Sequence, residues 1–217
     1  CIRDRGYGDY LTYGEKLAAL ARANTRFMIF GATIDGQPGH TISCDNVAGG
    51  SRATRHLLDH GRKRIAFLGN ISQRSPELAD RYDGYCEALL DAGIRPTRDL
   101  QVDAMSSEGQ GYRATLELLE RGVDFDAIFA VTDVIAIEAM RALEDNGLTI
   151  PTDVAVVGFD DISLAGHVSP ALTTVRQDIR QASEGLVQGI VGLIRGEPVE
   201  STLMAPRLVV RASCGAL

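Results

Sequence analysis

Short apolar runs recur through the middle of the chain at intervals of about 30 residues, and this spacing restricts the fold more than any other feature. Four of them begin near residues 65, 100, 127 and 154, with helix-like segments between them. A strand, a helix and a return strand together need about 30 residues, the length of one βαβ unit. The runs are continuously apolar, which is typical of strands buried on both faces. The sequence therefore predicts a parallel sheet with helices on both sides.

The same reasoning assigns the expected elements. Strands are expected at 26–30, 40–44, 65–69, 100–104, 127–131, 154–159, 202–205 and 208–210. Helices are expected at 15–24, 47–60, 78–92, 108–121, 134–146 and 178–195. Gly147 is well placed to follow the end of the fifth helix, because helices commonly end on a left-handed glycine. Residues 1–14 have no clear period, and 35–39 are expected to form a turn.

Composition excludes several classes of protein. Apolar residues make up 45% of the 217 residues, so the chain can bury a core rather than stay disordered. No apolar run reaches the roughly 18–20 residues that a membrane span needs. The formal net charge of −7 argues against this chain binding nucleic acid by itself, because phosphate binding needs clustered Lys and Arg. The absence of Trp argues against stacking platforms for single strands.

The four cysteines are Cys1, Cys44, Cys86 and Cys214. Their spacing matches neither a zinc knuckle nor a CxxC redox pair, and a disulfide is possible but unnecessary at this chain length. We expect a reducing, cytoplasmic context. No signal peptide opens the sequence, and its start at Cys1 rather than Met suggests a fragment, a processed product or a renumbered chain.

Polar residues follow the expected strands, and in parallel sheets ligands bind outside the carboxyl ends of strands. These residues are Arg81, Met105, Ser106, Ser107, Thr132, Asp133, Asp160 and Asp161. One arginine, hydroxyl groups and one or two carboxylates suit a polyhydroxylated small ligand, since Asp accepts from hydroxyls and Arg donates. Asp160 is expected to be a ligand acceptor and Asp161 a loop-start cap. Thr132 and Asp133 precede a helix, so either could cap it, and Thr132 could also contact a ligand.

Other candidate motifs have simpler explanations. His56 and His60 have the spacing of a zinc pair, but a third ligand is not evident, so surface or helix-end histidines are expected. Gly109 and Gly111 lack the third glycine of a dinucleotide motif and are interpreted as helix-start residues. No catalytic nucleophile–base pair is visible. The sequence therefore predicts a ligand-binding α/β protein that is not an enzyme, with no metal and no cofactor.

Several sequence blocks, in order, carry a specific resemblance. They are SCDN (43–46), HLLDHGRKRIAFLG (56–69), RYDGY (81–85), AIFAVTDVIAIEAMRAL (127–143), IPTDVAVVGFDDI (150–162), PALTTVRQD (170–178) and LVVRAS (208–213). Together they resemble the lactose/galactose-repressor (LacI/GalR) family of bacterial transcription regulators, over roughly residues 26–212.

The resemblance implies a periplasmic-binding-protein-like fold, in which two Rossmann-like lobes with parallel sheets are joined by three crossovers. The N-terminal lobe would comprise residues 1–44 and 177–206, incomplete at its start. The C-terminal lobe would comprise 45–176 and 207–217. An effector would bind in the cleft between the lobes.

The family's effector contacts carry over to individual positions. Arg81 matches its charged donor and Asp160 its acceptor. Thr132 stands where the family has Asn, so a bidentate contact is lost. Ser106 stands near a position that is often aromatic, without a ring for stacking. Gln177, at the second crossover, and Glu77, ahead of Arg81, are further candidate ligand contacts.

The resemblance also implies partners. The chain would be the effector-binding and dimerisation domain of a regulator, with a sugar or sugar derivative as ligand. It would form a homodimer and reach operator DNA through an N-terminal helix-turn-helix that this sequence lacks, with no membrane contact. The alternative is a periplasmic solute-binding protein of a sugar transporter, which has the same fold.

Overall fold

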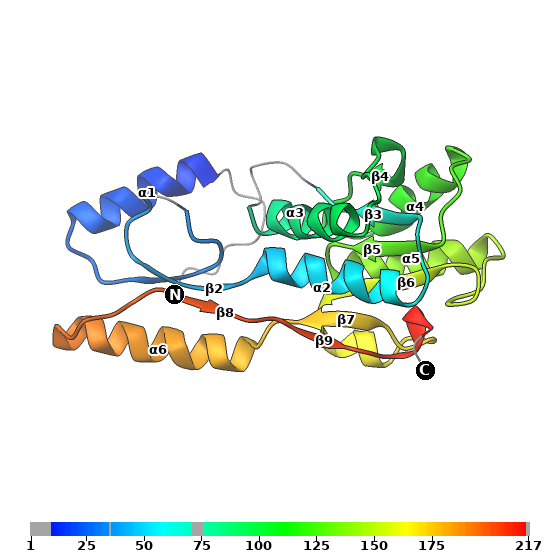
Figure 1. Ribbon diagram of the computed structural model, residues 1–217. Coiled ribbons are helices and arrows are strands. Elements are labelled where there is room, and N and C mark those ends of the chain that lie inside the picture. The colour runs from blue at the N-terminus through cyan, green and yellow to red at the C-terminus, as the bar shows by residue number, and fades with distance from the viewer. Residues whose placement is uncertain (1–9, 35, 71–75, 216–217) are drawn as a thin grey trace. The chain divides into compact units, whose positions relative to one another are not determined.

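The computed structural model describes residues 10–34, 36–70 and 76–215, and the side chains of these residues from 14 onward (Figure 1). They divide into two compact units. Unit 1 comprises the described residues of Cys1–Asp45, Ser72–Glu77 and Gln177–Ala205, and unit 2 those of Asn46–Ile71, Leu78–Arg176 and Pro206–Leu217. The chain thus passes between the units several times.

Unit 2 contains a six-stranded sheet in the order β4-β3-β5-β6-β7-β9. Its strands are β3 (Ile65–Leu68), β4 (Gln101–Val102), β5 (Ala127–Ala130), β6 (Ala155–Asp160), β7 (Thr173–Arg176) and β9 (Arg207–Val209). Its helices are α2 (Asn46–Asp59), α3 (Pro76–Asp91, whose first two residues belong to unit 1), α4 (Gln110–Glu120) and α5 (Asp133–Asp145). All strand pairs are parallel except β7 with β9, which are antiparallel. An antiparallel edge strand is common on an otherwise parallel sheet.

Two neighbouring residues of β6 show which helices cover which face of this sheet. A Cβ on Gly158 would lie against Asp133 and Ala136 of α5, whereas the ring of Phe159 lies against Gly49 of α2. Successive residues of a strand point to opposite faces. Helices α2 and α5 therefore cover opposite faces, as expected for strands that are apolar throughout.

Glycines allow helices α2 and α3 to pack closely. A Cβ on Gly84 of α3 would lie 2.0 Å from the carbonyl oxygen of Val47, and one on Gly50 of α2 would lie 2.1 Å from that of Arg81. Such distances are far shorter than van der Waals contact, so helices α2 and α3 touch backbone to backbone. This contact fixes the backbone of Arg81 against α2.

Unit 1 is smaller. Its three-stranded parallel sheet has the order β1-β2-β8, formed by β1 (Met28–Phe30), β2 (His40–Cys44) and β8 (Thr202–Met204). Helix α6 (Ile179–Arg195) packs on it through Ala182, while α1 (Tyr10–Arg22) precedes the sheet. The contact of α6 with the sheet buries Ile42 and Met204.

The predicted α/β class is confirmed, and the longer elements begin and end within about two residues of expectation. Two local predictions were wrong. The strand expected at 100–104 shrinks to Gln101–Val102, because Arg98–Leu100 forms a 3₁₀ turn. The first helix begins at Tyr10, within a stretch that shows no period. Gly147 does follow α5 in the left-handed region, at φ +79°, and Gly109 is the N-cap of α4. Residues 1–9 and 71–75 lie outside the described residues, as does residue 35 of the turn expected at 35–39.

The α2–α3 contact predicts the effect of a single methyl group. Gly84→Ala should lower the free energy of unfolding by about 1–3 kcal/mol, since overpacking a tight contact forces the helices apart. Denaturant unfolding followed by circular dichroism measures this. Gly166→Ala is the control, because its Cβ would meet Arg211 at an ordinary 3.9 Å. Equal stability of both variants would contradict this packing.

Candidate functional site

A buried arginine forms the centre of the polar cluster at the carboxyl ends of the unit 2 strands. Arg81, on α3, is 4% exposed. Its Nε donates to Asn46 Oδ1 at 2.9 Å, and its Nη1 donates to the Val131 carbonyl at 2.6 Å. Its guanidinium carbon lies 3.6 Å from the centroid of the Phe159 ring, in a cation–π contact. Three neighbouring elements thus fix the guanidinium, which keeps a buried charge hydrogen-bonded.

Asp160, the last residue of β6, lies beside this arginine. Its Oδ1 is 3.3 Å from Arg81 Nη1, and its side chain is 29% exposed. The pair therefore consists of a buried cation and a partly exposed carboxylate. A donor and an acceptor side by side can hydrogen-bond vicinal hydroxyls of a ligand.

Two hydroxyl groups form a second polar pair. The Oγ atoms of Ser106 and Thr132 lie 2.9 Å apart, and Thr132 directly follows Val131, whose carbonyl binds Arg81. Thr132 also caps α5, because its hydroxyl accepts from the Ile135 amide at 3.5 Å. The structure thus joins Arg81 to Asp160 and Ser106 to Thr132, while ligand contact by these four residues stays a prediction.

The other two predicted contacts, Glu77 and Gln177, belong to unit 1. Glu77 Oε1 accepts from the backbone amide of Ala32 at 3.0 Å. The carbonyl of Gln177 accepts from the Ile179 amide as α6 begins. Ligand contact by either residue also stays a prediction.

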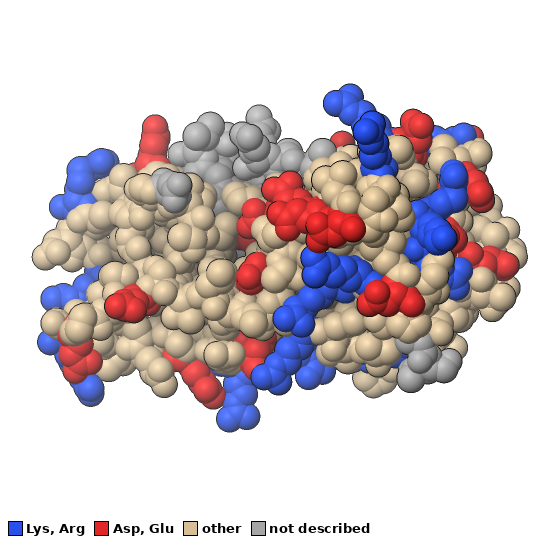
Figure 2. Space-filling model, viewed as in Figure 1, with Lys and Arg blue, Asp and Glu red and all other residues tan. Residues whose placement is uncertain are grey.

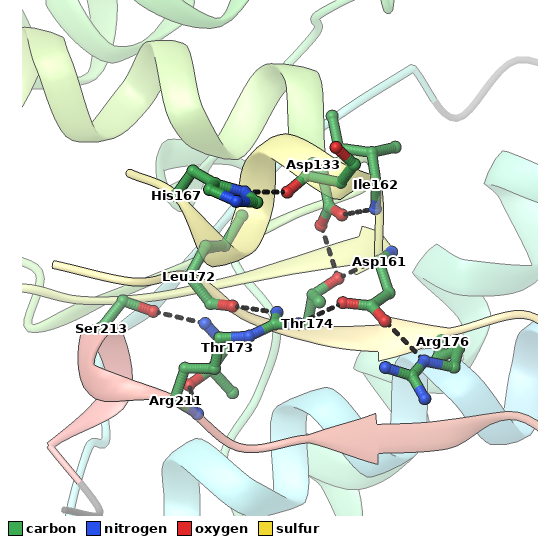
Figure 3. Close-up of polar contacts among 11 residues, drawn as sticks. Asp133, Asp161, Ile162, His167, Leu172, Thr173, Thr174, Arg176, Arg211 and Ser213 are labelled. Atoms are coloured by element: carbon green, nitrogen blue, oxygen red, sulfur yellow. Dashed lines mark hydrogen bonds and ion pairs between the residues drawn. The ribbon is translucent and has the colours of Figure 1, made fainter. Parts of the chain in front are cut away.

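Two predicted capping roles were wrong, as Figure 3 makes visible. Asp133 does not cap α5, because Thr132 does. Instead its fully buried carboxylate accepts from the Thr174 hydroxyl and, at 2.8 Å, from the Ile162 amide. Asp161 is not a loop cap either, since its two oxygens bind Arg176 Nε and Arg211 Nη2.

The two carboxylates have opposite pKa shifts. Burial raises the pKa of Asp133 to about 7, an effect that the hydrogen bonds from Thr174 and Ile162 oppose and the charges of Asp160 and Asp161 reinforce. Burial also acts to raise the pKa of Asp161, but the hydrogen bonds and charges of Arg211 and Arg176 outweigh it, so this pKa is lowered.

Sequence reasoning missed Asn46 and Phe159 as supports of the arginine. Asn46 directly precedes the helix expected at 47–60, and a polar residue in that place is typical of a helix cap, so only its position could have singled it out. Within the described residues, no three His, Cys, Asp or Glu side chains gather as metal ligands would. His60 Nδ1 lies 2.7 Å from the His56 carbonyl oxygen at the end of α2.

No helix among the described residues has the length and apolarity of a membrane span.

A family model described as "Periplasmic binding protein-like domain" matches residues 54–214. The transcriptional regulator CelR of Thermobifida fusca is 35% identical over 190 residues, which cover 85% of this chain and 56% of CelR. The chain spans about half the length of the curated relatives it matches.

Solved structures of regulators are similar throughout most of the chain. A complex of the regulator CelR with cellobiose superposes with a TM-score of 0.83 at 34% identity, covering 89% of this chain and 60% of that one. A LacI-family regulatory protein from Chloroflexus aggregans has a TM-score of 0.84 at 32% identity, covering 91% of this chain and 72% of that one.

The raised pKa of Asp133 predicts a pH dependence of stability. The folded pKa of about 7 exceeds the ordinary value of 3.8, so between these values the folded state binds the proton more tightly. The contribution of Asp133 to the free energy of unfolding therefore falls as pH rises from about 4 to about 7 and is constant above. Asp133→Asn does not titrate, so the Tm of the wild type minus that of the variant should fall over this range. Parallel pH profiles would contradict the assignment.

Proposed function

The chain belongs to the periplasmic-binding-protein-like domain family, in the form found in LacI-family regulators, and we propose that it senses a small effector for a bacterial transcriptional regulator. The effector proposed is a sugar or a sugar derivative. The observation that carries this proposal is the pairing of buried Arg81 with partly exposed Asp160 at the carboxyl ends of the strands. The relatives are transcriptional regulators, so neither an enzyme nor a transporter component is favoured.

The chemistry of the cluster supports a polyhydroxylated ligand. Arg81 offers N–H donors held in place by Asn46 and Val131, and Asp160 offers acceptor oxygens. The adjacent hydroxyls of Ser106 and Thr132 can both donate and accept. A ligand with several hydroxyl groups satisfies such a mixed set. The structure of CelR in complex with cellobiose is a precedent in a similar protein.

The departures from the family pattern suggest how this chain selects its ligand. Thr132 supplies one hydroxyl where the family has an amide, and Ser106 offers no ring for stacking. We infer that recognition here depends on hydroxyl–hydroxyl hydrogen bonds more than on stacking. Glu77 and Gln177 are proposed as further contacts from unit 1.

We further propose that the units are the two lobes of a sensor and that the longer protein is a cytoplasmic homodimer acting on operator DNA. On the face drawn in Figure 2, acidic and basic side chains lie beside one another, and the net charge is −7. Such a surface suits a domain that leaves DNA contact to another part of the protein. The effector would change DNA affinity only through its differential affinity for two arrangements of the protein.

A panel of sugars that includes cellobiose, ribose and galactose tests the proposal by thermal shift. A sugar that binds the folded state only should raise the free energy of unfolding by about 2.7 kcal/mol at a free concentration of 100 times its Kd. Failure of every mono- and disaccharide tested to raise the Tm would contradict the proposed function.

The site itself is tested by Asp160→Asn. Loss of a charge-assisted hydrogen bond should weaken binding of a sugar identified in the panel about tenfold, as measured by calorimetric titration. Asp153→Asn is the matched control. The Asp153 carboxylate also accepts a hydrogen bond, from the Thr149 amide, but Asp153 precedes β6 and so lies at the opposite end of this strand from Asp160. Wild-type affinity in Asp160→Asn would show that the cluster is not the binding site.

A further inference from the structure

The backbone at the end of β6 has an uncommon conformation. Asp160 has φ +116° and Asp161 has φ +54°, two successive non-glycine residues with positive φ. Such residues are rare outside glycine and persist only where the surroundings fix them. Because Asp160 is the residue that faces Arg81, the groups that hold this conformation also determine where its carboxylate lies.

The buried carboxylate of Asp133 holds the segment on one side. Its Oδ2 accepts from the amide of Ile162, and its Oδ1 accepts from the hydroxyl of Thr174 on β7. The Thr174 oxygen in turn lies 3.4 Å from the amide of Asp161 and accepts from it. Asp133 thus contacts, directly or through Thr174, the amides of the two residues that follow Asp160.

Gly158 makes room for this carboxylate. A Cβ at Gly158 would lie 2.3 Å from Asp133 Oδ1, so only glycine allows Asp133 to reach across β6 to Thr174. A carboxylate at the start of α5 could instead have bonded the amides of its own helix, but Thr132 supplies that cap. The contacts of Asp133 are therefore directed to the segment after β6.

An ion-pair group holds the segment on the other side. Asp161 Oδ2 binds Arg176 Nε and Asp161 Oδ1 binds Arg211 Nη2 at 2.6 Å (Figure 3). Arg211 is itself fixed, because its Nη1 donates to the Leu172 carbonyl at 2.7 Å. With its side chain bound in this way, Asp161 cannot turn toward Arg81 in place of Asp160.

We propose that Asp133, acting through Thr174 and Ile162, is a positioning residue that sets Asp160 beside Arg81 for ligand binding. This inference rests on the proposed function for its consequence, since the positioned carboxylate is the one proposed to bind the sugar. The positioning of Asp160 by Asp133 involves residues of unit 2 alone. A change at Asp133 or Thr174 therefore alters the Arg81 environment without touching Arg81.

The test follows the Arg81 Nε–Hε signal in ¹H–¹⁵N NMR spectra of the ligand-free 217-residue chain, assigned by its loss in Arg81→Lys. Asp133→Asn replaces one acceptor oxygen by a donor, and Thr174→Val removes the hydroxyl while keeping the shape. Both should shift the Arg81 signal. Thr174→Ser keeps the hydroxyl and should leave it in place, which rules out a general loss of packing.

Asp126→Asn is the matched control. Asp126 also accepts two hydrogen bonds, from the amides of Lys63 and Arg64, but it precedes β5 and so lies at the other end of the strands. It should lower stability without moving the Arg81 signal. Wild type, Thr174→Ser and Asp126→Asn together define the range of Arg81 chemical shifts expected without a positioning effect. If the Arg81 signals of Asp133→Asn and Thr174→Val both fall within that range, the positioning role is overturned.

Calorimetric titration with cellobiose, ribose and galactose adds the functional consequence. For a sugar that binds the wild type, Thr174→Val should weaken affinity about tenfold, because small misplacements of a binding group have effects of this size or larger. Thr174→Ser should stay within about twofold of wild type, as expected for a conservative change that preserves the bond. If no sugar binds the wild-type chain, the proposed function fails, and the Arg81 signal still decides the positioning role.

Discussion

The fixed guanidinium of Arg81 is the interaction on which the candidate site depends. A charge buried to this degree is tolerated only when it has polar partners. Asn46 on α2 and Val131, the residue after β5, accept its hydrogen bonds, and Asp160 at the end of β6 forms an ion pair with it. The close contact of α2 and α3 at Gly50 and Gly84 places the backbone of Arg81 at the distance from which its side chain reaches these partners. Fold and site are therefore determined by the same packing.

Around this centre, ionisable groups have separate tasks according to their environment. Asp160 stays partly exposed and can contact a ligand. Asp133 is buried, and its carboxylate accepts hydrogen bonds from Ile162 and Thr174. Asp161 is neutralised by two arginines. These three carboxylates thus differ in role because their burial and their partners differ. Neither property can be inferred from their positions in the sequence.

Much of the fold could be predicted from the sequence, because long apolar periodicities such as those of α5 and β6 arise directly from burial. The direction of β9 could not, since the pattern of a short edge strand is the same in either direction. The placement of Arg81 and Asp160 after predicted strands made them candidates, and the resemblance to a known family supported both. The roles of Asp133 and Asp161 were predicted wrongly, because they depend on the positive φ values at 160 and 161 and on a contact across Gly158. No local propensity encodes such a contact.

The central claim is that Arg81 and Asp160 bind the effector together. The most direct measurement is a titration of the wild-type chain with a sugar that raises its Tm, while the Arg81 Nε–Hε signal is followed by NMR. The account predicts that this signal moves in proportion to the fraction of protein bound, because the ligand enters its hydrogen-bonding environment. A sugar that stabilises the chain and saturates it while the Arg81 signal stays unmoved would contradict the account.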